Sequence, residues 1–214
     1  MDERVSVPHL APHFQDRRQQ SHAARLGMWV FIGSEALLFS ALFALYAAYW
    51  AMYPTEFRDS IGYTDHALGA AMTGILLTSS LLVAISLDRV RADHPREAML
   101  SLGGAIPLGL AFLCLKAFEY KDHFEHGLLP GAWYRATDST GNGPNIFFTL
   151  YYTMTGLHAI HVIAGLCLLG WLIARIRAGG IVADYDTPLE LGGMYWHFVD
   201  VVWVFLWPLF YLLG

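Results

Sequence analysis

The stretch that decides the fold class is GMYWHFVDVVWVFLWPLFYLLG, residues 193–214. It is rich in Trp, Phe, Val and Leu, and its length matches the roughly 20 residues that a helix needs to cross a bilayer core. Two of its residues are ionisable: His197 and Asp200 lie three positions apart, and therefore on one face of a helix. Because such groups are costly in a bilayer, we expect the pair to face protein or water and to have a function.

The composition of the whole chain also indicates a membrane protein. Of its 214 residues, 56% are apolar and 14% are charged, against about 25% charged residues in a typical soluble domain. The net charge of -5 provides no general attraction for nucleic acid. Cys114 and Cys167 stand alone in apolar stretches, so neither a disulfide framework nor a thiolate metal site is indicated. The polar N-terminus lacks an apolar signal core, and no cleaved signal peptide is expected.

Five apolar stretches are long enough to span a membrane. Their backbones must be helical, because lipid offers no partners for peptide groups. The sequence therefore predicts an all-α, polytopic membrane helix bundle, with a polar tail at 1–25 and a single domain at 26–214. We expect the tail to be ordered only by a partner, and the loop at 120–145 to be irregular because of its Gly, Pro and Asn content. The predicted spans are 26–50, 67–87, 98–119, 146–174 and 192–213.

The distribution of basic residues predicts the orientation. Nine of the thirteen Lys and Arg residues lie in the tail and in the loops after the second and fourth spans. The opposite side has only Arg58, Lys121 and Arg135. Since positive loops stay in the cytoplasm, we predict the N-terminus inside and the C-terminus outside.

Five ionisable residues within the spans form a candidate polar cluster. A carboxyl near the midplane is costly, so a functional role is one interpretation. The alternative is structural, because hydrogen bonds between helices contribute about 0.6 kcal/mol each and fix the packing. A metal site built from the three histidines, with Asp200 behind them, or haem ligation from facing helices also remains open. The cluster consists of Glu35, His158, His161, His197 and Asp200.

Five strings, read in order, resemble subunit III of the haem-copper terminal oxidases, most closely the cytochrome c oxidase type. The strings are LGMWVFIGSEALLF (26–39), LLTSS (76–80), LGLAFLCLKAFEY (108–120), GLHAIHVIAG (156–165) and YWHFVDVVWVFL (195–206). The resemblance covers roughly residues 22 to 213. Besides the five cluster residues, the positions that match the family motifs are Glu119, Tyr120, Trp196 and Trp203.

The resemblance implies a subunit without catalytic residues, haem, copper or another redox centre of its own. It implies packing on subunit I, which holds the haem and copper, in a complex with subunit II. In that role the chain would support proton uptake and durability while oxygen is reduced by cytochrome c. It also implies an enzyme role only within the complex, possible contact with phospholipid, and a bacterial cytoplasmic membrane as location.

Among the departures from the family pattern, two bear on the fold and on the candidate site. Many members have seven spans, whereas this sequence shows five. Lys116 stands where many members have glutamine; its long side chain can reach outward, and we expect it to pair with Glu119.

The sequence is also compatible with other functions. Within the family, the chain could serve a quinol oxidase or be an accessory chain of nitric oxide reductase. From another class, a stand-alone proton channel or transporter could use the Glu, His and Asp side chains, although no repeat halves typical of transporters are visible. A haem-binding redox bundle is a further alternative.

Overall fold

The computed structural model describes residues 14, 16–131 and 142–213, and these form a bundle of helices. Five of the helices are long and apolar enough to cross a membrane, so the predicted all-α membrane bundle is confirmed. Outside helices, the described part has one isolated bridge, between Val182 and Tyr185. The helices are α1 (Arg17–Met52), α2 (Pro54–Ile61), α3 (His66–Arg91), α4 (Pro95–Glu125), α5 (Gly143–Arg177) and α6 (Thr187–Tyr211).

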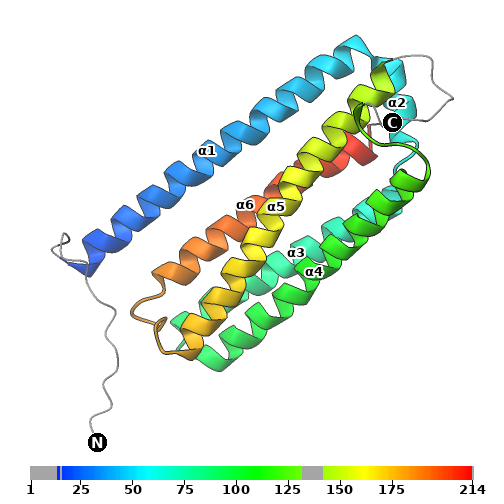
Figure 1. The fold of residues 1–214 in the computed structure, drawn as a ribbon. Helices are drawn as coiled ribbons and strands as arrows, with labels where there is room; N and C mark the ends of the chain where they lie inside the picture. Colours follow the sequence, from blue (N-terminus) through cyan, green and yellow to red (C-terminus); the bar gives the residue numbers. More distant parts are fainter. Residues whose placement is uncertain (1–13, 15, 132–141, 214) are drawn as a thin grey trace, which may run out of the picture.

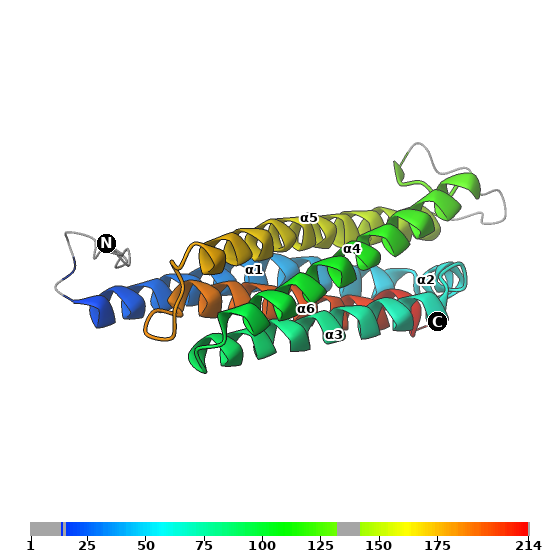
Figure 2. The same cartoon turned by 90° about the horizontal axis from the view of Figure 1, so that it is seen from below.

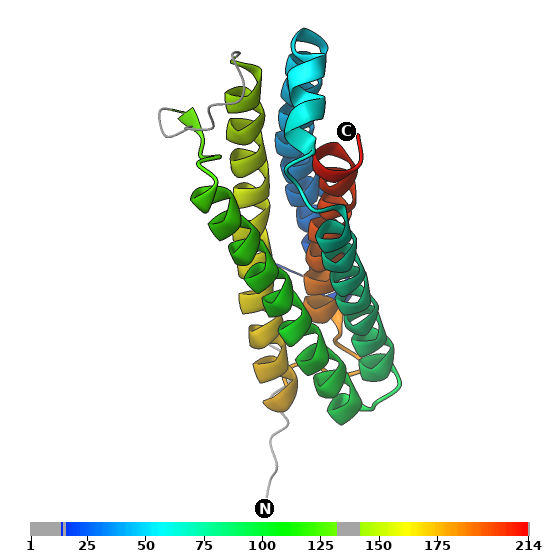
Figure 3. The same cartoon turned by 90° about the vertical axis from the view of Figure 1, so that its right-hand side faces the viewer.

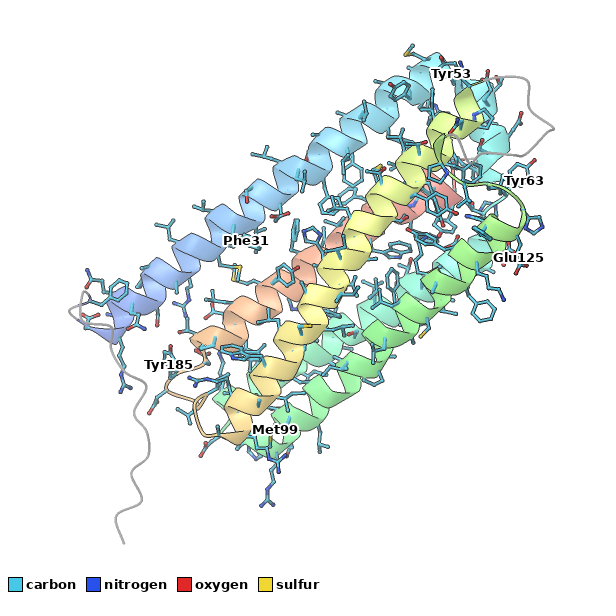
Figure 4. All side chains as sticks on the ribbon, viewed as in Figure 1. Phe31, Tyr53, Tyr63, Met99, Glu125 and Tyr185 are labelled. Carbon is cyan, nitrogen blue, oxygen red and sulfur yellow. The ribbon has the colours of Figure 1, made fainter. Side chains whose placement is uncertain are left out.

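The long helices run side by side along one common direction (Figure 2). α3 and α4 form an antiparallel pair (Figures 1 and 3), and α5 and α6 lie next to them. α1 stands at the opposite margin of the bundle (Figure 1). α1 begins at one end of the bundle and α6 finishes at the other (Figure 1). We call these the N-side and the C-side. Met99 and Tyr185 lie near the N-side, whereas Tyr53, Tyr63 and Glu125 lie near the C-side (Figure 4).

Local sequence signals explain where the helices begin. The Asp16 side chain accepts a hydrogen bond from the Gln19 amide (2.6 Å), which caps α1. Asp65 caps α3 in the same way through the amides of Ala67 and Leu68 (2.8 and 3.2 Å). The other four helices have proline in their first turn, where the missing N–H causes no loss.

The helices extend beyond the apolar stretches, and two expectations need correction. α1 already begins at Arg17, and Arg25 binds Glu190 at 2.7 Å while Ser21 bonds Thr187 at 3.0 Å. Residues 17–25 are therefore ordered by this chain itself, and not only by a partner. Similarly, α4 continues to Glu125, so the loop expected at 120–145 starts later; its residues 132–141 lie outside the described part.

Burial differs strongly between the helices. In the most apolar 18-residue stretch of α6 half of the residues are buried within the chain, whereas in that of α1 only 6% are. α6 carries the largest fully buried side chains, Trp196 and Trp203, and the Trp203 ring lies 4.7 Å from that of Phe112 on α4. α6 is therefore the central helix of the bundle, and α1 is peripheral.

Candidate functional site: ionisable groups inside the bundle

Glu35 and His161 form a pair that joins the middle of α1 to the middle of α5. The Glu35 Oε2 and His161 Nε2 atoms are 3.1 Å apart, and the two side chains are only 20% and 14% exposed. His161 Nδ1 lies 2.8 Å from the Leu157 carbonyl oxygen. Because a carbonyl can only accept, Nδ1 carries a proton. The other ring nitrogen therefore shares a single proton with Glu35, and the pair can hold that proton on either partner.

His197 and Asp200 lie together in the middle of α6 but have different surroundings. His197 Nδ1 is 2.6 Å from the Ser80 hydroxyl, so it links α6 to α3. Asp200 is 3% exposed, and neither of its carboxyl oxygens has a hydrogen-bond partner among the described residues. The Ser80 hydroxyl, which lies 2.6 Å from His197 Nδ1, is also close to the Asp200 carboxyl. An orphaned carboxyl of this kind requires water or another partner.

His158 is fully buried in an aromatic environment. Its ring lies 5.6 Å from that of Phe112 on α4 and 5.3 Å from that of Trp203 on α6. Neither ring nitrogen has a hydrogen-bond partner in the described part of the chain. His158 thus faces α4 and α6, although it is only three residues from His161, which faces α1.

The three intramembrane histidines therefore point toward three different helices and do not converge. Across residues 16–131 and 142–213, no three His, Cys, Asp or Glu side chains are grouped as metal ligands. The three histidines therefore do not form the metal site that the sequence left open. The five residues of the candidate cluster do not share one hydrogen-bond network either; the structure pairs only Glu35 with His161.

A second polar centre lies toward the C-side, around Lys116. Its amine donates to Glu119 Oε2 at 2.9 Å, as expected. The Lys116 side chain is, however, 3% exposed and points inward, so the prediction that it reaches outward is wrong. The same amine donates to the hydroxyls of Tyr151 (2.8 Å) and Tyr211 (2.9 Å). The Tyr211 hydroxyl in turn donates to both Glu119 oxygens at 2.7 and 2.8 Å. This buried ion pair thereby connects α4, α5 and the last residue of α6.

The remaining motif residues support the packing around these centres. The Tyr120 hydroxyl lies 2.6 Å from that of Thr155, and the Trp203 indole donates to Thr73 at 3.1 Å. Trp196 is fully buried, and its indole nitrogen has no partner among the described residues. Sequence reasoning missed the roles of Ser80, Tyr151 and Tyr211, because each depends on a helix distant in sequence. Only Lys116 gave a signal, as a charge inside an apolar span.

The comparisons with known proteins agree with these motifs. The family model described as cytochrome c oxidase subunit III matches residues 16–214. The chain is 32% identical to cytochrome c oxidase subunit 3 of Alkalihalophilus pseudofirmus, over 88% of this chain and 86% of the relative. It is 26% identical to cytochrome bo(3) ubiquinol oxidase subunit 3 of Pseudomonas aeruginosa, over 100% and 97%. It is 29% identical to the haem-copper oxidase subunit I+III of Aeropyrum pernix, over 88% of this chain and 22% of that relative.

The matched region contains all five long helices, both partners of the Glu35–His161 pair and the Lys116 centre. Its extent and the level of identity are sufficient to assign a family. The chain therefore belongs to the cytochrome c oxidase subunit III family, whose members are third subunits of haem-copper oxidases of the cytochrome c or quinol type.

Proposed function

We propose that this chain is the non-catalytic subunit III of a proton-pumping oxidase that receives electrons from cytochrome c. It packs on subunit I, which carries the haem and copper, in a complex that includes subunit II, within the bacterial cytoplasmic membrane. Cytochrome c is favoured over quinol as the donor because the named cytochrome c oxidase relatives reach 32% identity, against 27% for the quinol type. The quinol type is the second candidate.

The observation that supports a role in proton supply is the pair of Glu35 and His161. It lies midway along two helices, shares a proton across one 3.1 Å hydrogen bond, and retains partial exposure on the side of α1. Such a pair can accept or release a proton without a large movement of the chain. We propose that it exchanges protons with a route in subunit I and so sustains turnover.

The experiment compares Glu35→Ala and Glu35→Gln in the purified whole complex. Glu35→Ala should leave haem content and initial turnover within a few-fold of the parent, but should speed the loss of activity during sustained turnover. If Glu35 only fixes packing, Glu35→Gln keeps its shape and hydrogen bonding and behaves like the parent. If Glu35→Ala abolishes haem reduction in a fully assembled complex, the non-catalytic assignment is wrong.

Partner identity needs a separate measurement. A tag on this chain should co-purify haem-containing subunits after gentle detergent extraction, together with any tightly held phospholipid. Reduced cytochrome c and a quinol are then supplied to the same preparation. Faster oxygen consumption with the quinol would show that the donor is a quinol and not cytochrome c. Recovery of the tagged chain without other subunits would contradict the proposal.

A further inference from the structure

A cavity of about 380 Å³ lies at the C-side, between the turn that precedes α3 and the last turns of α4, and its lining is part apolar and part polar. Its polar lining comes from Tyr63 and Asp65 at that turn, and from Glu119, Asp122 and His123 on α4. Water takes up about 30 Å³ per molecule in the liquid, so the cavity has room for several molecules. Its lining includes Glu119, one partner of the buried ion pair.

His123 gives independent evidence that this cavity holds a hydrogen-bonding ligand. The residue is 2% exposed, and its Nδ1 atom has no hydrogen-bond partner among the described residues. The rings of Tyr151 and Phe148 lie 5.3 and 5.6 Å from the His123 ring, and the Tyr63 backbone hydrogen-bonds to the same side chain. His123 is itself a lining residue of the cavity, and a buried imidazole nitrogen without a protein partner is normally satisfied by ordered water.

The ion pair behind the cavity can change its protonation without becoming exposed. Glu119 lies four residues before His123, on the same face of α4. When Glu119 is protonated, Lys116 loses its counter-charge, but its amine remains over the rings of Tyr151 (4.4 Å), Trp203 (5.3 Å) and Tyr211 (5.5 Å). Cation–π attraction to these rings supports the positive charge in that state.

We propose that this cavity is an aqueous access site, through which the Lys116–Glu119 pair exchanges a proton with the C-side of the membrane. Hydronium in the cavity gives a proton to Nδ1 of His123 and becomes water. The imidazolium then passes a proton through a cavity water to the Glu119 carboxylate, which becomes the neutral acid, and His123 returns to its neutral form. The reverse sequence releases the proton.

Several titratable and charged groups surround this site. Those on α4 are Tyr120 and Asp122, and those on the turn before α3 are Tyr63 and Asp65. Two further sets come from the packed helices: Tyr151, Tyr152 and His158 on α5, and Tyr211 on α6. The acidic groups at the mouth attract protons, whereas Lys116 repels them from the interior. His123 lies between these two influences, as a relay requires.

Infrared spectroscopy of the reconstituted whole complex tests this proposal. The carboxyl band of protonated Glu119 is identified by its loss in Glu119→Gln. In the parent, the band should grow when the C-side alone is acidified. In His123→Phe, its growth should slow by at least ~10-fold, as expected when a positioned acid–base group is removed. In His123→Asn, which keeps a polar group at this position, growth of the band should be equally slow. Agreement of the two variants would show that the slower growth does not come from a folding defect of His123→Phe.

His126→Phe is the matched control. His126 lies one turn further along the chain and is 65% exposed, so the parent rate should persist. An unslowed band in an assembled His123→Phe complex would overturn the proposal, as would a band that follows N-side pH, or the absence of such a band at any pH. The proposal is independent of the role of Glu35, because Glu35→Ala leaves this site intact.

Discussion

The Trp196 indole on α6 lies directly against the backbone of Gly165 on α5: a Cβ atom on Gly165 would be 2.6 Å from Cε3 of the indole. On α4, a Cβ on Gly109 would be 3.0 Å from Cη2 of the same ring. Small residues in membrane helices allow this kind of close approach. Trp196 therefore fills a space between α4 and α5 that exists only because two glycines face it.

Gly165→Ala should destabilise the subunit by about 1–3 kcal/mol, because the added methyl forces the indole to move in a filled core. The loss should appear as a lower unfolding midpoint of the detergent-solubilised complex. Gly170→Ala is the control on the same helix, since nothing lies within 4 Å of its Cβ position. That change should be neutral, or stabilising by up to about 1 kcal/mol through helix propensity. Equal effects of the two substitutions would contradict this packing.

The Lys116–Glu119 pair should show strong energetic coupling. Lys116→Gln or Glu119→Gln alone leaves one buried charge without its partner, and should reduce the free energy of unfolding by roughly 3–5 kcal/mol. The double substitution removes both charges and should cost much less than the sum of the two. Unfolding midpoints for the four proteins of this cycle give the coupling energy. Additive losses would mean that the two side chains do not interact as an ion pair.

The hydrogen bond between Ser80 and His197 should make a small contribution to stability. Ser80→Ala removes this one hydrogen bond between α3 and α6, and is expected to cost about 0.6 kcal/mol, with ~1.7 kcal/mol as the upper range. Thr78→Val on the same helix is the control, because the Thr78 hydroxyl bonds only the Gly74 carbonyl of its own helix (2.7 Å). A larger loss in Thr78→Val would show that the interhelical bond is not the source.

The predicted orientation can be measured by labelling engineered cysteines in sealed vesicles. Cys114 and Cys167 are exposed on the helix surfaces, so both are replaced by serine first. A cysteine introduced at Gly214 should react with an impermeant thiol reagent from outside, because the basic residues gather at the other end of the bundle. A cysteine at Ser6 provides the opposite control and should react only after the vesicles are opened. The reverse pattern would invert the topology.

The sequence predicted the membrane helices well, since each span repeats a strong local signal in length and apolar content. It also identified Glu35 and His161 as ionisable groups in spans, but not as partners, because 126 positions separate them. The inward direction of Lys116 was missed for a similar reason. Its hydrogen-bond partners Tyr151 and Tyr211 come from two other helices. In a sequence, a tyrosine near a helix end is equally explained by the aromatic belt at the membrane interface, so neither tyrosine indicated a partner for Lys116.

α1 is synthesised well before the residues that it binds, and this affects how the subunit assembles. The ribosome makes α1 before α5 and α6, yet Arg25 and Glu35 bind residues 165 and 126 positions later in the chain. At synthesis rates of about 5–20 residues per second, roughly 6–25 s pass between the translation of Glu35 and that of His161. During that interval the newly inserted helix carries a carboxyl without its final partner. Until His161 arrives, retention of α1 in the bilayer depends on its apolar surface and on whatever other chain or water satisfies Glu35.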